Sequence, residues 1–234
     1  MRAVILAGGK GTRLAPYTTI VPKPLLPVGE QPIVEILIRQ LRNHGFHRIT
    51  LALGHLAHLV KAVLGNGDHM GVEIDYSIEN TALGTSGPIA LLKDLSETFV
   101  VLNGDILTDL NFGSLLKFHK DNRFALTVAC HERKVNIDYG VVHSDGFRIV
   151  GYEEKPVLSF HVSAGIYVFE PTVLERIVPG RYLDFPDLVN DMLRKGDRVG
   201  SYPFNGMWFD LGRIEDFQSV QESWDELRQN VPFL

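Results

Sequence analysis

Residues 1–24, MRAVILAGGKGTRLAPYTTIVPKP, decide how the rest of this chain is organised. Residues 3–7 are a continuous apolar run without alternation, which is typical of a strand buried on both faces of a parallel sheet. Gly8, Gly9 and Gly11 follow, and glycine lets the backbone approach a ligand directly. Because the amide groups of such a loop can converge on phosphate oxygens, the stretch predicts a strand followed by a phosphate-binding loop.

Three basic residues, Lys10, Arg13 and Lys23, accompany the loop and supply positive charge for a polyanion. The two prolines beside Lys23 restrict the backbone that presents it. The spacing differs from a P-loop, because the lysine precedes the last glycine instead of following it. It also differs from a dinucleotide fingerprint, because Leu14 stands where a third glycine is needed. The pattern favours another kind of nucleoside triphosphate site over a plain glycine-rich turn.

The composition excludes several classes of protein. The 234 residues, 45% hydrophobic and 22% charged, can bury a sizeable core. A net charge of −5 disfavours nucleic acid as a partner but permits a nucleotide ligand. The single cysteine, Cys130, fits a reducing compartment, and no apolar run reaches the ~20 residues of a membrane span. With the first strand at the N-terminus there is no room for a signal peptide, so we expect a cytoplasmic protein without membrane contact.

Alternating strands and helices predict the architecture. The first half carries apolar strands separated by helical patterns, which indicates βαβ units and a parallel sheet. Short turns then join three further strands, which predicts an antiparallel extension. We therefore expect an α/β fold with a three-layer, Rossmann-like, mixed but mostly parallel sheet. The strands are predicted at 48–53, 72–78, 98–102, 124–130, 139–142 and 147–153, and the helices at 31–44, 56–64, 89–95, 184–194 and from 212 onward. His55 and His58 are expected on one polar helix face.

Polar residues follow the predicted strands, where open α/β sheets bind ligands. Residues 79–88, ENTALGTSGP, are one such segment, although a helix start capped by Thr85 or Ser86 is a simpler interpretation. Asp105 ends another strand and offers the oxygen ligand that Mg²⁺ prefers. Asp210 lies between two apolar residues, where a charge is costly unless it is paired or binds a cation.

These motifs together resemble the signature of the sugar-1-phosphate nucleotidyltransferases, also called NDP-sugar pyrophosphorylases. The resemblance covers nearly all of the chain and rests on LAGGKGTRL at 6–14, PKP at 22–24, LGT at 83–85, NGD at 103–105, EKP at 154–156 and WFDLG at 208–212. It implies a GT-A-like nucleotidyltransferase fold with an antiparallel sugar-binding extension. The expected organisation is one domain over 1–234, mainly nucleotide-binding over 1–122 and mainly sugar-phosphate-binding over 123–234, without the C-terminal left-handed β-helix of some longer relatives.

The resemblance also implies a role for each motif residue. Arg13 and Lys23 are catalytic, on the leaving pyrophosphate and the α-phosphate respectively, and Asp105 and Asp210 hold Mg²⁺ as the cofactor. The residues assigned to the nucleotide are Leu6, Ala7, Gly8, Gly9, Gly11, Thr12, Glu79, Gly84 and Thr85. Those assigned to the sugar phosphate are Asn103, Gly104, Gly140, Glu154, Lys155 and Gly165. Ser163 and Ala164 stand where the family usually has an asparagine.

The implied reaction joins an NTP and a sugar 1-phosphate into an NDP-sugar and pyrophosphate. Residues 82–89 and 206–212 look most like mannose- and heptose-1-phosphate guanylyltransferases, so GTP is favoured, with uridylyl or thymidylyl transfer to another sugar 1-phosphate as the alternative. A GT-A glycosyltransferase is expected to show a D-x-D motif, which 103–105 lacks. A non-catalytic nucleotide-sugar sensor is expected to have lost a metal ligand or Arg13. The last predicted helix is a lid on the sheet or a contact within a homo-oligomer, and the sequence leaves both open.

Overall fold

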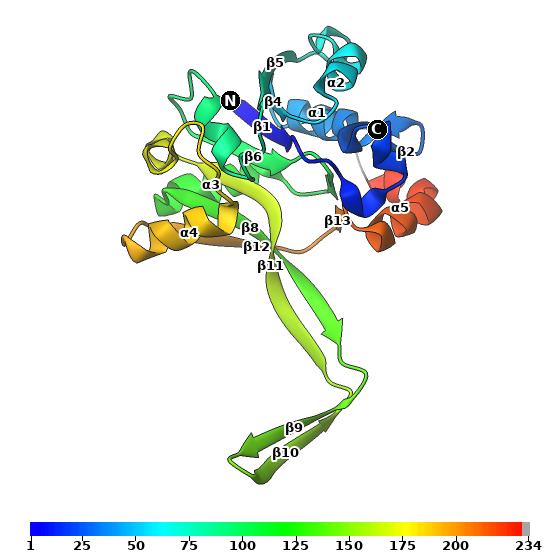
Figure 1. Cartoon of the computed structure of the whole chain (residues 1–234), viewed down its shortest axis with the longest axis vertical. Helices are drawn as coiled ribbons and strands as arrows, with labels where there is room; N and C mark the ends of the chain where they lie inside the picture. The colour runs from blue at the N-terminus through cyan, green and yellow to red at the C-terminus, as the bar shows by residue number, and fades with distance from the viewer. Residues whose placement is uncertain (231–234) are drawn as a thin grey trace.

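The computed structural model describes residues 1–230 and contains a seven-stranded central sheet with helices on both faces (Figure 1). Strand β11 runs antiparallel to both of its neighbours, and every other neighbouring pair in this sheet is parallel. The mixed, mostly parallel sheet expected from the sequence is therefore confirmed. In sheet order the strands are β12 (Val199–Phe204), β8 (Leu126–Asn136), β11 (Val157–Phe169), β6 (Phe99–Asn103), β1 (Arg2–Ala7), β4 (Arg48–Leu53) and β5 (Glu73–Ile78).

Two hydrophobic clusters, one on each face of the sheet, make the three layers. The first holds side chains of α1 (Ile33–Asn43), α2 (Ala57–Leu64) and α3 (Phe112–Asn122). The second holds side chains of α4 (Phe185–Arg194) and of the 3-10 helix η6 (Pro171–Arg176). Between them, Ala3, Val4 and Ile5 of β1 are completely buried. This burial on both faces explains why the strand shows no polar alternation.

A third cluster closes the edge of the molecule near the glycine-rich loop. It packs α5 (Ile214–Leu227) against Leu14 and Leu26, which flank the catalytic segment predicted from the sequence. Beside it, the short strands β7 (Ile106–Thr108) and β13 (Trp208–Asp210) pair antiparallel. A further pair of short strands, β2 (Pro27–Val28) and β3 (Gln31–Pro32), leads into α1. No helix within residues 1–230 is long and apolar enough to cross a membrane.

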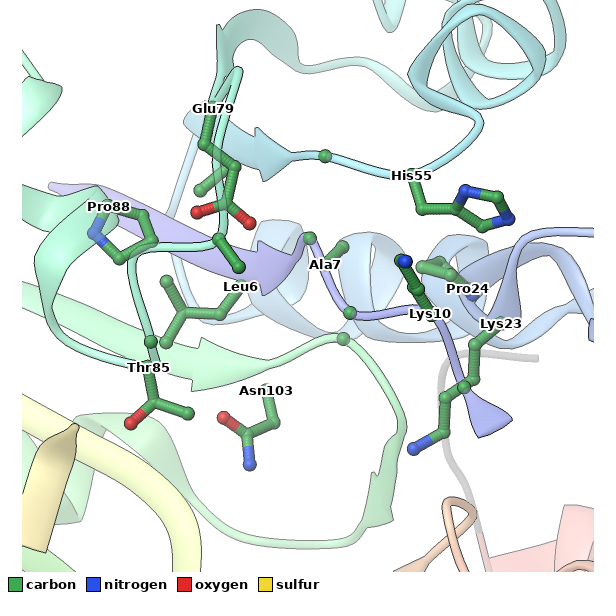
Figure 2. A pocket seen from close by; sticks show the side chains of 18 of the residues that line it. Leu6, Ala7, Lys10, Lys23, Pro24, His55, Glu79, Thr85, Pro88 and Asn103 are labelled. Carbon is green, nitrogen blue, oxygen red and sulfur yellow. The ribbon is translucent and has the colours of Figure 1, made fainter. Parts of the chain in front are cut away.

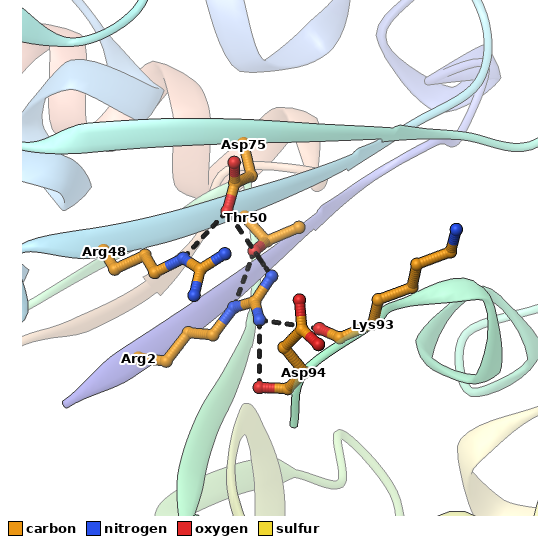
Figure 3. Close-up of polar contacts among 6 residues, drawn as sticks. All are labelled: Arg2, Arg48, Thr50, Asp75, Lys93 and Asp94. Atoms are coloured by element: carbon orange, nitrogen blue, oxygen red, sulfur yellow. Dashed lines mark hydrogen bonds and ion pairs between the residues drawn. The ribbon is translucent and has the colours of Figure 1, made fainter. Parts of the chain in front are cut away.

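The prediction of a helix over residues 89–95 is wrong, both in the type of helix and in its length. The segment forms only the 3-10 helix η5 (Gly87–Leu91). Beyond it, Arg2 Nη1 donates to the carbonyl oxygens of Lys93 at 2.7 Å and Asp94 at 3.3 Å (Figure 3). Asp94 also adopts a φ of 60°. Because Arg2 binds carbonyls that a longer helix would use internally, the chain turns back toward β1 instead of continuing as a helix.

The largest departure from the predicted elements is a two-stranded projection, which we call the arm and define as residues 132–163. Strand β8 was predicted to end at residue 130 but continues to Asn136, paired with β11 (Figure 1). The arm ends in a hairpin of β9 (Gly140–Asp145) and β10 (Arg148–Glu154). This is the antiparallel extension expected from the sequence, and Figure 1 shows it projecting away from the three layers.

A buried histidine links the α3 layer to the sheet. His119 is fully buried, with Nδ1 2.8 Å from Thr127 Oγ1 and Nε2 3.1 Å from a carboxylate oxygen of Glu170. That oxygen also accepts a hydrogen bond from Thr98 Oγ1 at 2.7 Å. Burial lowers the pKa of His119, and the hydrogen bond that His119 donates to Glu170 only partly opposes this effect. The neutral ring therefore fits this position, with Nε2–H donating to Glu170.

This histidine predicts a loss of stability in mild acid. Below a pH of ~6.5 the unfolded chain takes up a proton at His119 that the folded chain resists. The free energy of unfolding is therefore expected to fall as the pH falls through that value. Urea denaturation at several pH values measures the slope, and His119→Gln is expected to flatten it. The exposed His58 provides the control, since His58→Gln should leave the slope unchanged.

Candidate active site

A cleft of about 740 Å³ opens at the carboxyl ends of β1, β4, β5 and β6 (Figure 2). This is where ligands bind in open α/β sheets. Lys10 and Lys23 reach into it from the glycine-rich loop and the segment after it (Figure 2). The residues predicted from the sequence that line this cleft are Leu6, Ala7, Gly8, Gly9, Gly11, Thr12, Arg13, Lys23, Glu79, Gly84, Thr85, Asn103, Gly104 and Asp105.

The backbone conformation and packing of the loop require glycine at two positions. Gly11 adopts a φ of +64°, and its carbonyl accepts a hydrogen bond from Thr18 Oγ1 at 2.7 Å. Gly8 lies directly against the Glu79 carboxylate, so a Cβ at residue 8 would collide with it. The Glu79 side chain is itself held, because its second oxygen accepts a hydrogen bond from the Leu83 amide at 3.1 Å. The loop and the segment after β5 thus fit together as one wall of the cleft.

Thr85 caps a helix, but not the one predicted from the sequence. Its hydroxyl oxygen accepts a hydrogen bond from the Phe185 amide at 2.7 Å, at the first residue of α4. Its own amide donates to Asp184 Oδ1 at 3.1 Å. The neighbouring Gly84, with a φ of +79°, packs against the Leu183 carbonyl. The capping interpretation and the cleft interpretation are therefore compatible, since one residue does both.

Two carboxylates face each other across Gly212. A Cβ on Gly212 would stand 2.8 Å from Asp210 Oδ1 and 2.9 Å from Asp105 Oδ2. The Gly212 amide donates to Asp210 Oδ1 at 2.9 Å, and the Leu211 amide donates to the Asp105 carbonyl at 2.8 Å. Mg²⁺ is usually held by one or two carboxylates together with phosphate oxygens and water. One oxygen of each carboxylate lies within 2.9 Å of the same point beside Gly212, so the two are close enough together to share such an ion.

Lys23 lies in the same space and forms an ion pair with Asp105. Burial lowers the pKa of Lys23 to about 8, an effect that Asp210 opposes and Arg13 reinforces. The ammonium therefore compensates the two carboxylates and remains mostly charged at neutral pH. Lys10 and Arg13, by contrast, form no ion pair with any residue in 1–230. The cleft thus holds positive charge that its own carboxylates do not neutralise.

Asp210 is held in place from the opposite side by Asp216 of α5. Asp216 Oδ2 accepts a hydrogen bond from the Asp210 amide at 3.1 Å, and its other oxygen pairs with Arg133 at 3.2 Å. Asp216 is buried. Since Arg133 belongs to the arm, this chain of contacts connects the base of the arm to one of the two carboxylates.

The structure separates three of the predicted sugar-phosphate residues from the cleft. Gly140, Glu154 and Lys155 lie on the arm and are not among the residues that line the cleft. Gly165 lies at the base of the arm, where a Cβ would stand 2.6 Å from Asn103 Nδ2. The sugar-phosphate role of all four residues stays a prediction. Within one copy of the chain, however, only Gly165 adjoins the cleft.

The cleft residues that sequence reasoning missed include His55 and Tyr182. His55 precedes α2 instead of lying on a helix face, and its amide donates to the Gly8 carbonyl at 3.3 Å. Its position just after β4 is the signal that could have found it, because loops after parallel strands form the ligand edge. Tyr182 comes from the segment before α4, and its hydroxyl donates to Asp184 at 2.6 Å. Nothing in the sequence indicates that this segment folds back onto the cleft.

Comparison with known proteins identifies the family. A model described as "Nucleotidyl transferase" matches residues 2–226. The chain belongs to this family. A crystal structure named as a glucose-1-phosphate thymidylyltransferase of Bacillus anthracis has a TM-score of 0.75 and 26% identity, covering 95% of this chain and 94% of that one. HddC of Yersinia pseudotuberculosis gives a TM-score of 0.74 and 26% identity, covering 95% and 99%. These similarities confirm the predicted nucleotidyltransferase fold.

The curated relatives differ in the nucleotide that their names give. The UTP–glucose-1-phosphate uridylyltransferase of a Synechocystis strain is 34% identical, over 93% of this chain and 61% of that protein. The mannose-1-phosphate guanylyltransferase of Mycobacterium tuberculosis is 35% identical, over 98% and 66%. The catalytic subunit beta of the guanylyltransferase of Danio rerio is 33% identical, over 100% and 70%. This nucleotidyl transferase chain therefore spans 61% to 70% of the length of these three relatives.

Proposed function

We propose that this chain transfers a nucleotidyl group from a nucleoside triphosphate to a sugar 1-phosphate, forming an NDP-sugar and pyrophosphate. The observation that carries the proposal is the gathering of three cations and two carboxylates around one glycine-rich loop at one cleft. Lys10 and Arg13 have no ion-pair partner among the described residues, Lys23 pairs with Asp105, and Asp210 lies beside this pair. The names of the relatives support the same class of reaction.

GTP with mannose 1-phosphate or heptose 1-phosphate is the substrate pair that we favour. The guanylyltransferase names of several relatives support GTP and mannose 1-phosphate, and a structure of HddC with bound GMP-PN supports a guanine nucleotide. The choice of heptose 1-phosphate as a possible substrate rests on the sequence resemblance alone. The uridylyltransferase and thymidylyltransferase names give equal support to UTP or dTTP with another sugar 1-phosphate, which is therefore the alternative.

The chemistry needs no side-chain nucleophile, because the sugar phosphate is already an oxyanion. One of its oxygens forms a bond to the α-phosphorus while the bond from that phosphorus to the oxygen shared with the β-phosphate breaks. Pyrophosphate leaves with the electron pair of the broken bond. Lys23 stabilises the charge on the α-phosphate, and Arg13 stabilises the charge on the leaving pyrophosphate. The loop amides hold the triphosphate in line for the attack.

Asp105 and Asp210 are the residues that would hold Mg²⁺. When bound, the ion neutralises phosphate charge and supplies electrostatic stabilisation to the reaction. The chain itself contributes two carboxylates fixed by the Leu211 and Gly212 amides. Lys23, which pairs with Asp105, is close enough to these carboxylates to balance their charge.

The decisive experiment measures pyrophosphate released from GTP, UTP, dTTP, CTP and ATP, with Mg²⁺ and a panel of sugar 1-phosphates. Release that requires both one NTP and one sugar phosphate is the expected result, and it names both specificities. Chelation of the metal with EDTA is expected to abolish it. Release without a sugar phosphate would contradict the proposal and indicate hydrolysis.

Two rival functions give different results in the same assay. A GT-A glycosyltransferase consumes a nucleotide sugar and releases no pyrophosphate. A non-catalytic nucleotide-sugar sensor binds nucleotide without turnover, so nucleotide binding with no release across the panel would favour it. Against the sensor stands the presence of Arg13, Lys23 and both carboxylates in the cleft region.

A further inference from the structure

Asp210 is the last residue of β13, and its backbone amide needs an acceptor outside the strand pair. The amide of the next residue, Leu211, points toward β7 and donates to the Asp105 carbonyl at 2.8 Å. Because successive amides of a strand point to opposite sides, the Asp210 amide points away from β7. A backbone amide inside a folded protein is rarely left without an acceptor. The group that accepts from this amide therefore helps to set the position of Asp210.

Asp216 of α5 supplies this acceptor. Its Oδ2 accepts a hydrogen bond from the Asp210 amide at 3.1 Å. The Asp216 side chain is only 10% exposed, so its charge also needs a partner. Arg133 provides that partner, with Nη2 3.2 Å from Oδ1 and Nη1 3.4 Å from Oδ2. Both carboxylate oxygens of Asp216 thus bind protein donors, one on β13 and the other on β8.

An acidic residue in the first turn of a helix often has a simpler role. Its charge stabilises the helix, or its carboxylate accepts a hydrogen bond from the amide of the N-cap residue in a capping box. In α5 the N-cap residue is Arg213, and its amide donates to the Asp210 carbonyl at 2.9 Å instead. Asp216, the third residue of the helix, reaches past Arg213 to the amide of Asp210. The contact therefore fixes the end of β13 as well as the start of α5.

Asp210 is held at three points. Asp216 accepts from its amide, the Arg213 amide donates to its carbonyl, and the Gly212 amide donates to its Oδ1 at 2.9 Å. Of these three contacts, the one from Asp216 is made by a side chain. A substitution can therefore remove it while the other two remain.

The charges around Asp210 are balanced on both sides. Asp105 has Lys23 as its partner, and Asp216 has Arg133. A buried carboxylate without such a partner is costly, so Arg133 keeps Asp216 in its place. Asp210 itself forms no direct ion pair with any residue in 1–230. Its carboxylate thus has charge left for a bound cation.

We propose that Asp216 is a positioning residue, which orients the Asp210 carboxylate for a divalent cation by holding the Asp210 amide. Arg133 supports it by neutralising its charge. The inference rests on the proposed function, because it gives Asp210 a role in metal binding. Residues that orient a metal ligand without touching the metal commonly change metal affinity by about 10- to 100-fold when they are substituted.

Metal binding to the free protein tests this role without any turnover. Mn²⁺ is the probe, because the electron paramagnetic resonance signal of the free ion reports how much is bound. Asp216→Ala is expected to weaken Mn²⁺ binding by about 10-fold. Glu215→Ala is the matched control and should keep the wild-type affinity, since Glu215 lies in the same turn but is 69% exposed and is 3.9 Å from Arg213. Equal affinities of the two variants would overturn the inference.

Two double variants separate the hydrogen bond from the charge. Arg133→Gln with Asp216→Asn keeps an oxygen that can accept from the Asp210 amide. Arg133→Gln with Asp216→Leu replaces that oxygen by an apolar group of similar size, and both doubles keep the net charge of the wild type. The first is expected to bind Mn²⁺ nearly as tightly as the wild type, and the second about 10-fold more weakly. Equal binding by the two doubles would show that the hydrogen bond to Asp210 has no effect, and it would overturn the inference even if Asp216→Ala did not fold.

The Mg²⁺ dependence of pyrophosphate release gives a second readout. In Asp216→Ala the Mg²⁺ concentration for half-maximal rate is expected to rise by about 10-fold, with kcat at saturating Mg²⁺ largely retained. A purely structural role would not produce a defect that added Mg²⁺ restores. A fall in kcat that persists at saturating Mg²⁺ would contradict the positioning role.

Asp210→Asn distinguishes failure of this inference from failure of the proposed function. It removes the charge of the ligand itself and is expected to weaken Mn²⁺ binding more than Asp216→Ala does. If Asp210→Asn weakens binding and Asp216→Ala does not, only the positioning role of Asp216 fails. If Asp210→Asn binds Mn²⁺ like the wild type, the metal-binding role proposed for Asp210 fails, and this inference fails with it.

Discussion

Arg13→Ala is expected to lower kcat by roughly two to three orders of magnitude, the usual cost of losing one charge-stabilising contact at a reacting centre. Arg13 lines the cleft and has no ion-pairing partner within residues 1–230, so its charge is available to the leaving pyrophosphate. The loss acts on the transition state, because pyrophosphate gains negative charge only as its bond to the α-phosphorus breaks. Steady-state pyrophosphate release with a cognate substrate pair measures the effect.

The fold should survive this change. The 3-10 helix η1 (Thr12–Leu14) is anchored by buried Leu14, and the Arg13 side chain makes no ion pair that the substitution would break. The thermal unfolding midpoint is therefore expected to stay close to that of the wild type. Arg194→Ala is the matched control, since it removes an exposed arginine whose pairing with Asp191 has little energetic value. A near-normal kcat for Arg13→Ala would remove Arg13 from the mechanism.

Much of the fold could be predicted because local sequence and tertiary context agree. The unbroken apolar run in β1 requires burial on both faces, and the structure provides it with helices on each side. Helix α3 was missed, although Asn111 caps it with a purely local signal by accepting a hydrogen bond from the Ser114 amide at 2.9 Å. The segment after η5 could not be predicted, because its path is set by Arg2, more than 90 residues away along the chain.

The site was predictable to the extent that its residues follow strands. The glycine-rich loop, Glu79 and Asp105 all follow parallel strands, and the carboxyl ends of such strands meet at one edge. Tyr182 was missed because it reaches the cleft through a contact between Asp184 and Thr85 that no local pattern encodes. The arm shows the same limit. Turn and strand signals predict a hairpin but do not specify where a two-stranded ribbon points, since that depends on packing against other parts of the structure.

The role of Asp105 and Asp210 as a metal-binding pair can be tested by adding a side chain at Gly212. Gly212→Ala is expected to abolish most activity, by about 100-fold or more, because displacing reacting groups by ~1 Å commonly costs that much. The new Cβ would lie 2.8 Å from Asp210 Oδ1 and 2.9 Å from Asp105 Oδ2, and it would also displace the Lys23 ammonium. Both carboxylates and the lysine must then move together. Kinetics at saturating NTP, combined with calorimetric titration of NTP with and without Mg²⁺, measure the consequence.

Retained stability would separate this effect from misfolding. Gly212 does not have a positive φ, so alanine meets no backbone strain there, and the Lys23 side chain can swing aside toward the open cleft. The unfolding midpoint is therefore expected to change little while Mg²⁺-dependent binding and turnover are lost. Gly113→Ala in α3 is the matched control, because its Cβ would meet only the Asn111 side chain at 3.3 Å. If Gly212→Ala kept normal turnover, the two carboxylates would not form the metal-binding pair, and the charge of Lys23 would be the part of the site left to explain catalysis.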